Sequence, residues 1–145
     1  MERISRDEVL IRTAELFALR STCNKPNGAV IAREGRIIST GYNGAPAGLP
    51  HCLDVGCQEG PDGACLRTVH AELNAIVMAA KFGISVEGAT LYCTSSPCPV
   101  CAKAIINAGI EKVLYRNEYR LPEGLGLLRT AGVATTCLNS NQEES

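Results

Sequence analysis

Residues 70–115 read HAELNAIVMAAKFGISVEGATLYCTSSPCPVCAKAIINAGIEKVLY, and this stretch decides the fold. Apolar residues recur in it at helical spacing, and short runs that contain β-branched and aromatic residues separate the helical segments. The same alternation continues to residue 137. We therefore expect helices and strands in turn over residues 70–81, 89–93, 98–108, 112–115, 123–131 and 133–137. Such alternation is typical of an α/β domain whose helices pack on both faces of one sheet.

The N-terminal segment predicts a further helix and a pair of strands. Ser5 and Glu8 have the spacing of a helix capping box, and helical periodicity then runs to about Arg20. Strand-like runs at 28–32 and 36–42 flank a turn that contains glycine. We expect this pair to be antiparallel and the later strands to be mostly parallel. The predicted fold class is therefore a three-layer α/β/α domain with a central mixed five-stranded sheet.

The same periodicity predicts which side of each helix is buried. In the first helix the periodic positions are Val9, Thr13, Leu16, Phe17 and Arg20. The helix over 70–81 is expected to bury Leu73, Ile76, Val77 and Ala80. The helix over 98–108 is expected to bury Cys101, Ala104, Ile105 and Ala108.

Length and composition indicate one ordinary globular domain. The chain has 145 residues, of which 46% are hydrophobic and 20% charged, with a formal net charge of −1. This balance gives no support to a nucleic-acid partner. No stretch approaches the roughly 20 apolar residues of a membrane span, and the N-terminus does not resemble a signal peptide. We expect a cytoplasmic protein with one domain over residues 1–138 and a frayed polar tail over 139–145.

Eight cysteines in such a chain need an explanation. Disulfides are disfavoured in a reducing compartment, so this density indicates metal binding. Cys93 and Cys137 lie in strand-like runs, and we interpret them as packing residues.

Two short segments carry the predicted chemistry. Cys98 and Cys101 are three residues apart where a helix begins, so both thiols lie on neighbouring positions at the positive end of the helix dipole. His70 opens another helix, and three protein ligands with one open position are what a catalytic zinc requires. Glu72 is close enough to serve as the proton shuttle if His70 lies at the helix entrance rather than within it. An H-x-E and a P-C-x-x-C segment together match the zinc deaminase signature.

With these motifs in place, the sequence resembles the deoxycytidylate (dCMP) deaminases of the cytidine deaminase superfamily. The resemblance rests on residues 41–46 (GYNGAP), 70–76 (HAELNAI) and 97–109, and it extends from Arg20 to Val133. It implies hydrolysis of dCMP to dUMP and ammonia, which supplies dUMP for dTMP synthesis. It also implies a homo-oligomer, with a hexamer favoured, and regulation by dCTP and dTTP. No nucleic acid or membrane partner is expected.

The resemblance also assigns roles to single residues. His70, Cys98 and Cys101 look like the zinc ligands, and Glu72 looks like the proton shuttle. Asn43 looks like a substrate contact, although Asn-Gly is also a common turn signal, and the backbone of Ala71 is a second candidate for holding the base. The sequence does not choose among the candidates for phosphate recognition, which are Asn27, Arg33, Tyr115, Arg116 and Tyr119.

A second zinc site is predicted from the irregular stretch over residues 43–68. A segment of that length without regular structure is unusual unless something holds it together. Four thiols that the catalytic site does not use are sufficient for a closed structural zinc site: Cys23, Cys52, Cys57 and Cys65. His51 is an alternative ligand for one of these positions.

Two other functions remain open. One is deamination of another substrate, such as cytidine, a modified cytosine nucleotide, guanine or tRNA adenosine. The other is a nucleotide-binding or assembly module that has lost catalysis, which the retention of Glu72 disfavours.

Overall fold

The computed structural model of the chain describes residues 2–61 and 63–139. Its five strands form one sheet in the order β2-β1-β3-β4-β5. Their bounds are β1 Gly28–Arg33, β2 Arg36–Tyr42, β3 Thr90–Ser95, β4 Lys112–Asn117 and β5 Ala134–Cys137. Strand β1 is antiparallel to both β2 and β3, whereas β3, β4 and β5 are parallel. The predicted mixed five-stranded sheet is confirmed.

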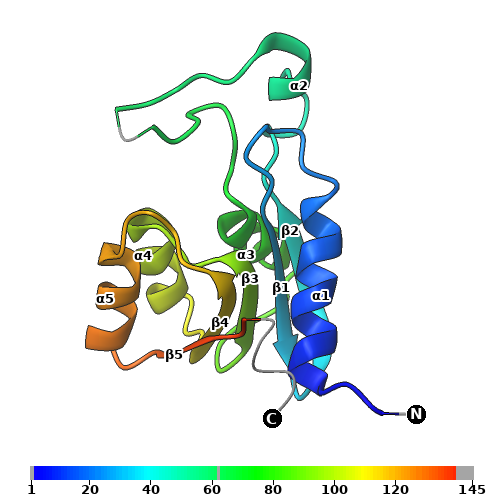
Figure 1. Ribbon diagram of the computed structural model, residues 1–145, viewed down its shortest axis with the longest axis vertical. Coiled ribbons are helices and arrows are strands. Elements are labelled where there is room, and N and C mark those ends of the chain that lie inside the picture. The colour runs from blue at the N-terminus through cyan, green and yellow to red at the C-terminus, as the bar shows by residue number, and fades with distance from the viewer. Residues whose placement is uncertain (1, 62, 140–145) are drawn as a thin grey trace.

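Helices cover both faces of this sheet (Figure 1). They are α1 Arg6–Ala18, α2 Cys52–Val55, α3 Ala71–Lys81, α4 Pro99–Asn107 and α5 Glu123–Thr130. On one face α1 packs against Val30, Tyr92 and Leu114. On the other face, α3, α4 and α5 pack against strand residues that neighbour these in the sequence, including Ile31 and Val113. Successive strand residues point to opposite faces, so the strands contribute to two cores in three layers.

The predicted buried side of α1 is wrong except at Phe17, which is half-buried against the core. The structure buries Leu10, Ile11, Ala14 and Ala18, while Val9 is 46% and Leu16 is 64% exposed. Ser5 caps the helix as predicted, because its Oγ accepts the Glu8 N–H at 3.0 Å. The Glu8 carboxylate, however, is buried against the sheet and binds Arg12 and Arg116.

The predicted buried side of α3 is right only in part: Leu73 and Ile76 are half-buried, and Ile76 packs against the core. Ala71, Glu72, Ala75 and Ala79 are buried, whereas Val77 is 47% exposed and Ala80 is exposed. The physical reason is close packing: a Cβ on Gly41 of β2 would lie 2.3 Å from the Ala71 carbonyl oxygen. Only small side chains fit between a helix and a sheet at this separation. In α4 Cys101 and Ile105 are buried as expected, together with Ala102, while Ala104 and Ala108 are half-buried.

The segment between β2 and α3 forms an arm that extends from the top of the sheet and contains the short helix α2 (Figure 1). Apart from α2, the arm has isolated antiparallel β-bridges, which pair Gly44 with Val69 and Glu59 with Cys65. Of the predicted frayed tail over 139–145, residues 140–145 lie outside the described residues. Among the residues that the structure describes, no helix is long and apolar enough to span a bilayer.

Candidate active site

The two predicted motif segments lie at the N-termini of α3 and α4. His70 is the N-cap of α3 and Cys98 is the N-cap of α4, and both have extended backbone angles. Pro99 follows in the first turn of α4, where its missing N–H leaves no bond unmade. The Cys98 thiol itself accepts the Cys101 N–H at 3.5 Å. His70 therefore stands outside the helical turns, as the spacing of His70 and Glu72 requires.

The side chains of His70, Cys98 and Cys101 converge. The His70 Nδ1 lies 3.4 Å from the Cys98 Sγ and 3.5 Å from the Cys101 Sγ. All three ligand atoms lie within 4.8 Å of one another. A tetrahedral zinc with bonds of about 2.0 Å to nitrogen and about 2.3 Å to sulfur would hold these atoms about 3.5 Å apart. The donor set and its spacing therefore fit zinc.

Electrostatics in this cluster favour a thiolate at Cys98. The hydrogen bond with the Cys101 side chain lowers the pKa of Cys98 to about 4. The same interaction raises the pKa of Cys101. The hydrogen bond with Cys98 also raises the pKa of His70, since the imidazolium is stabilised beside a negative sulfur. Metal binding requires deprotonated ligands, so a thiolate in this cluster favours it.

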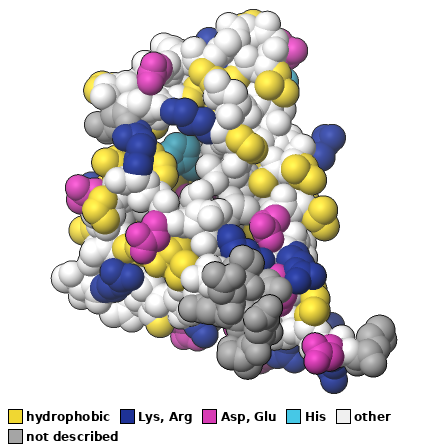
Figure 2. Space-filling view, in the orientation of Figure 1, with side chains coloured by type: hydrophobic (Ala, Val, Ile, Leu, Met, Phe, Trp, Pro, Cys, Tyr) yellow, Lys and Arg dark blue, Asp and Glu magenta, His cyan; other side chains and the backbone are white. Residues whose placement is uncertain are grey.

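Glu72 adds a buried carboxyl group beside these ligands. Its residue is 5% exposed, and burial raises the pKa of the carboxyl above its ordinary value. Glu72, His70 and Cys98 all line one cavity of about 410 Å³. Figure 2 shows a histidine in a hollow of the surface with Lys or Arg side chains beside it. The site thus combines a set of metal ligands, a carboxyl group that can carry a proton, and space for a small molecule.

Three of the predicted substrate contacts line the same cavity: Asn27, Asn43 and Tyr119. The Asn43 side chain is 6% exposed and bonds within the protein at both ends. Its Oδ1 accepts the Ala71 N–H at 2.8 Å, and its Nδ2 donates to the Lys25 carbonyl at 2.9 Å. The backbone of Ala71 is the second candidate for holding the base. Ala71 is fully buried, and its N–H already donates to Asn43.

The structure does not bring the remaining candidates to this cavity. Tyr115 is 2% exposed and lies in the hydrophobic core, because β4 is covered on both faces. Arg116 points to the opposite face of the sheet, where it donates to Glu8 and Glu15. Arg33 donates to the carbonyl groups of Ser85 and Glu87.

Sequence reasoning missed several residues of the cavity wall. They include Lys25, Ser95, Ser96, Glu118 and Arg120. Four of these lie at or just beyond the carboxyl ends of the neighbouring parallel strands β3 and β4. Ligands of open α/β sheets bind at that edge, so the strand ends were the signal that could have found them.

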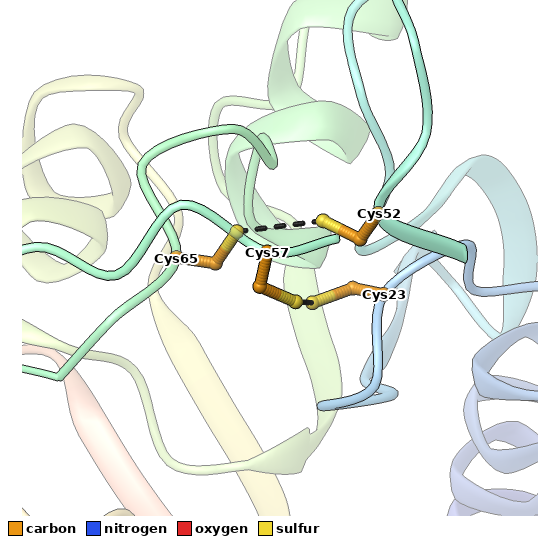
Figure 3. Close-up of side chains that lie close together, drawn as sticks. All are labelled: Cys23, Cys52, Cys57 and Cys65. Atoms are coloured by element: carbon orange, nitrogen blue, oxygen red, sulfur yellow. Dashed lines mark hydrogen bonds between the residues drawn. The ribbon is translucent and has the colours of Figure 1, made fainter. Parts of the chain in front are cut away.

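The four remaining predicted metal ligands also come together. Figure 3 shows the side chains of Cys23, Cys52, Cys57 and Cys65 pointing toward one another. The Sγ atoms of Cys52 and Cys65 are 3.4 Å apart, and those of Cys23 and Cys57 are 3.7 Å apart. All four Sγ atoms lie within 4.8 Å of one another. Four sulfurs around a tetrahedral zinc would be about 3.8 Å apart, so this cluster also fits the ion.

Polar groups around this cluster support one thiolate. Burial opposes ionisation of Cys65, but bonds from the backbone of Gln58 and Arg67 and from the Cys52 side chain lower its pKa to about 6. His51 is directed elsewhere, since its Nδ1 lies 3.1 Å from the Thr22 hydroxyl.

Comparison with known proteins identifies the family. Residues 4–117 match the family described as the cytidine and deoxycytidylate deaminase zinc-binding region. The chain is 47% identical over 135 residues to ComE operon protein 2 of Bacillus subtilis, covering 92% of this chain and 71% of that protein. It is 39% identical over 150 residues to the deoxycytidylate deaminase of Enterobacteria phage T4, covering 77% and 78%.

A solved structure agrees with these matches. The dCMP deaminase of cyanophage S-TIM5, in complex with dCMP and dUMP, superposes with a TM-score of 0.83 at 39% identity. The match covers 95% of this chain and all of that one. With the fold, the zinc-binding motifs and the relatives in agreement, this chain belongs to the dCMP deaminase family, within the cytidine and deoxycytidylate deaminase zinc-binding superfamily.

Proposed function

We propose that this protein hydrolyses dCMP to dUMP and ammonia. The observation that carries the proposal is the meeting of His70, Cys98 and Cys101 beside the buried Glu72 on the wall of one cavity. This arrangement offers a metal ligand set that leaves one position open, together with a group that transfers protons.

The residues of the site divide the work as follows. His70, Cys98 and Cys101 would hold a zinc ion, whose Lewis acidity makes water a nucleophile near neutral pH. Glu72 takes a proton from the water that attacks C4 and passes it to N3 of the ring; it then moves the second proton, from the hydroxyl group on C4, to the amino group, which leaves as ammonia. Asn43 bonds the backbone of Ala71 and so holds the entrance of α3, which carries both His70 and Glu72, in place.

The cavity and the relatives favour a nucleotide as the substrate. Two cationic side chains, Lys25 and Arg120, contribute to the cavity wall, and they suit a phosphate group. The relatives from phage T4 and cyanophage S-TIM5 are named as dCMP deaminases. A tRNA-editing function would require a basic face, which 14 basic against 15 acidic residues do not provide.

A substrate panel tests this proposal. We expect ammonia release from dCMP to exceed that from cytidine, deoxycytidine, dCTP, guanine and tRNA adenosine.

In Glu72→Gln we expect a loss of kcat of about 10²- to 10⁴-fold with zinc still bound. The control is Glu123→Gln, which changes an exposed carboxylate on α5. Preference for another substrate would overturn the assignment to dCMP, and full activity of Glu72→Gln would overturn the mechanism.

We further propose that Cys23, Cys52, Cys57 and Cys65 hold a second, structural zinc. The four sulfurs leave no open ligand position, and three of the four residues are buried. The cluster joins the segment that follows α1 to the arm between β2 and α3. Its role would be to keep Ala64, Cys65 and Thr68 in the cavity wall.

We also propose that the chain forms a homo-oligomer, with a hexamer favoured, and that dCTP and dTTP regulate it. Several large apolar side chains are more than half exposed, which suits burial between subunits: Leu16, Leu19, Leu53, Leu66, Phe82 and Val100. Light scattering with and without each nucleotide is expected to give the mass of a hexamer. A monomer under all conditions would contradict this.

A further inference from the structure

Asn27 is placed on the cavity wall directly before strand β1. Its Oδ1 accepts a hydrogen bond from the Thr94 hydroxyl, with an oxygen–oxygen distance of 2.8 Å. Thr94 lies on the neighbouring strand β3 and is 8% exposed. A buried hydroxyl group thus contacts one end of an amide whose residue faces the cavity.

A second hydrogen bond uses the same hydroxyl group as an acceptor. The Gly28 N–H donates to the Thr94 Oγ1 at 3.1 Å, so the hydroxyl oxygen already acts as an acceptor there. A hydroxyl group has a single hydrogen to donate, and the bond to Asn27 uses it. In this arrangement the Asn27 amide presents its oxygen to Thr94 and directs its NH₂ group, with two donors, away from it.

The Asn27 NH₂ group is accessible and is not used by the protein. Within residues 2–61 and 63–139 no hydrogen bond is recorded for this nitrogen, and it is not among the buried polar atoms that lack a partner. Asn43, the other amide on the cavity wall, differs because both of its ends bond within the protein. Asn27 is therefore the amide that offers donors to a bound molecule.

We propose that Thr94 is a positioning residue that orients Asn27 so that its NH₂ group donates to an acceptor oxygen of the bound nucleotide. The inference rests on the proposed function for the nature of the ligand. Two oxygens of a cytosine nucleotide have the required chemistry: the 2-keto oxygen of the ring and a phosphate oxygen. If Thr94 did not hold the amide, Asn27 could turn and present its own oxygen, which repels such a group.

The test is a double-mutant cycle on dCMP deamination. Thr94→Val removes the hydroxyl at nearly constant volume, and we expect KM to rise about three- to ten-fold while kcat changes less than about twofold. Thr94→Ser restores the hydroxyl and should restore KM. In an Asn27→Leu background, Thr94→Val should raise KM no further, because its effect passes through Asn27. Thr136→Val, on an exposed position of β5, is the control.

Comparison of substrates identifies the acceptor. If the oxygen belongs to phosphate, the effect of Thr94→Val disappears on deoxycytidine, and if it belongs to the ring the effect persists. Asn27→Asp can still accept from Thr94 but offers oxygen to the cavity, so its KM should rise more than about tenfold. This variant keeps the test valid if Thr94→Val does not fold.

Two outcomes would overturn the proposal. The first is an equal increase in KM for Thr94→Val with and without Asn27, which would show a merely structural role. The second is an atomic-resolution crystal structure of the unaltered protein in which the Asn27 oxygen faces the cavity. The crystal structure tests the orientation of Asn27 without any measurement of activity. Failure of the protein to deaminate dCMP would therefore overturn the proposed function alone.

Discussion

At the scale of single residues, Asn43 connects three parts of the site. It follows β2, it accepts the N–H of Ala71 at the start of α3, and it donates to the carbonyl of Lys25 in the loop before β1. The first N–H groups of a helix have no partner within the helix. A side chain from a distant part of the chain therefore completes the end of α3 that carries His70.

We predict that Asn43→Ala destabilises the protein by about 1–3 kcal/mol, because the buried Ala71 N–H and the Lys25 carbonyl lose their partner. It should also weaken zinc binding at His70, whose backbone position depends on the same contact. Urea denaturation and competition with a chelator measure the two effects. Asn107→Ala, at an exposed position of α4, should change stability by less than about 0.5 kcal/mol. Equal effects of the two variants would contradict this role for Asn43.

At the scale of elements, the position of α4 relative to α5 determines where the cysteine ligands lie. A Cβ on Gly124 of α5 would lie 2.0 Å from the Pro97 carbonyl oxygen, directly before Cys98. The close approach of α5 thus holds the backbone of the P-C-x-x-C segment. No property of the local sequence around Gly124 indicates this contact.

Two glycines of the same helix provide a matched comparison. Gly124→Ala should cost about 1–3 kcal/mol, because the Pro97 backbone has to move, and it should lower zinc affinity at Cys98. Gly126→Ala adds a Cβ that meets nothing within 4 Å. It should stabilise the protein by about 0.5–1 kcal/mol, since glycine is unfavourable within a helix. Thermal denaturation in the presence of zinc would distinguish them, and a stable Gly124→Ala with normal zinc affinity would refute the prediction.

At the scale of the whole molecule, the four-cysteine cluster joins the arm between β2 and α3 to the segment that follows α1. The arm contributes Ala64, Cys65 and Thr68 to the cavity wall, yet it contains little regular structure. The thiols of the arm meet that of Cys23, which belongs to the segment after α1.

We predict that Cys57→Ser lowers the zinc content from two ions to one per chain. The arm should then become sensitive to limited proteolysis, and KM for dCMP should rise because part of the cavity wall is displaced. Cys137→Ser, outside both clusters, should retain two ions and the normal cleavage pattern. Metal analysis by mass spectrometry decides the matter: two ions in Cys57→Ser, or one in the unaltered protein, would rule out the second zinc.

The sequence by itself determined the order of helices and strands apart from the short helix α2, the mixed sheet, and the two groups of side chains that could hold a metal. These features depend on local periodicity and on residue types with few alternative uses, so neighbouring residues are sufficient to reveal them. Only the tertiary structure decided which sides of α1 and α3 are buried, that Tyr115 belongs to the core, and that Asn27 rather than Asn43 keeps its donors available. Each of these depends on how closely distant segments approach: α3 lies so near Gly41 that alanines, rather than larger apolar residues, face the sheet.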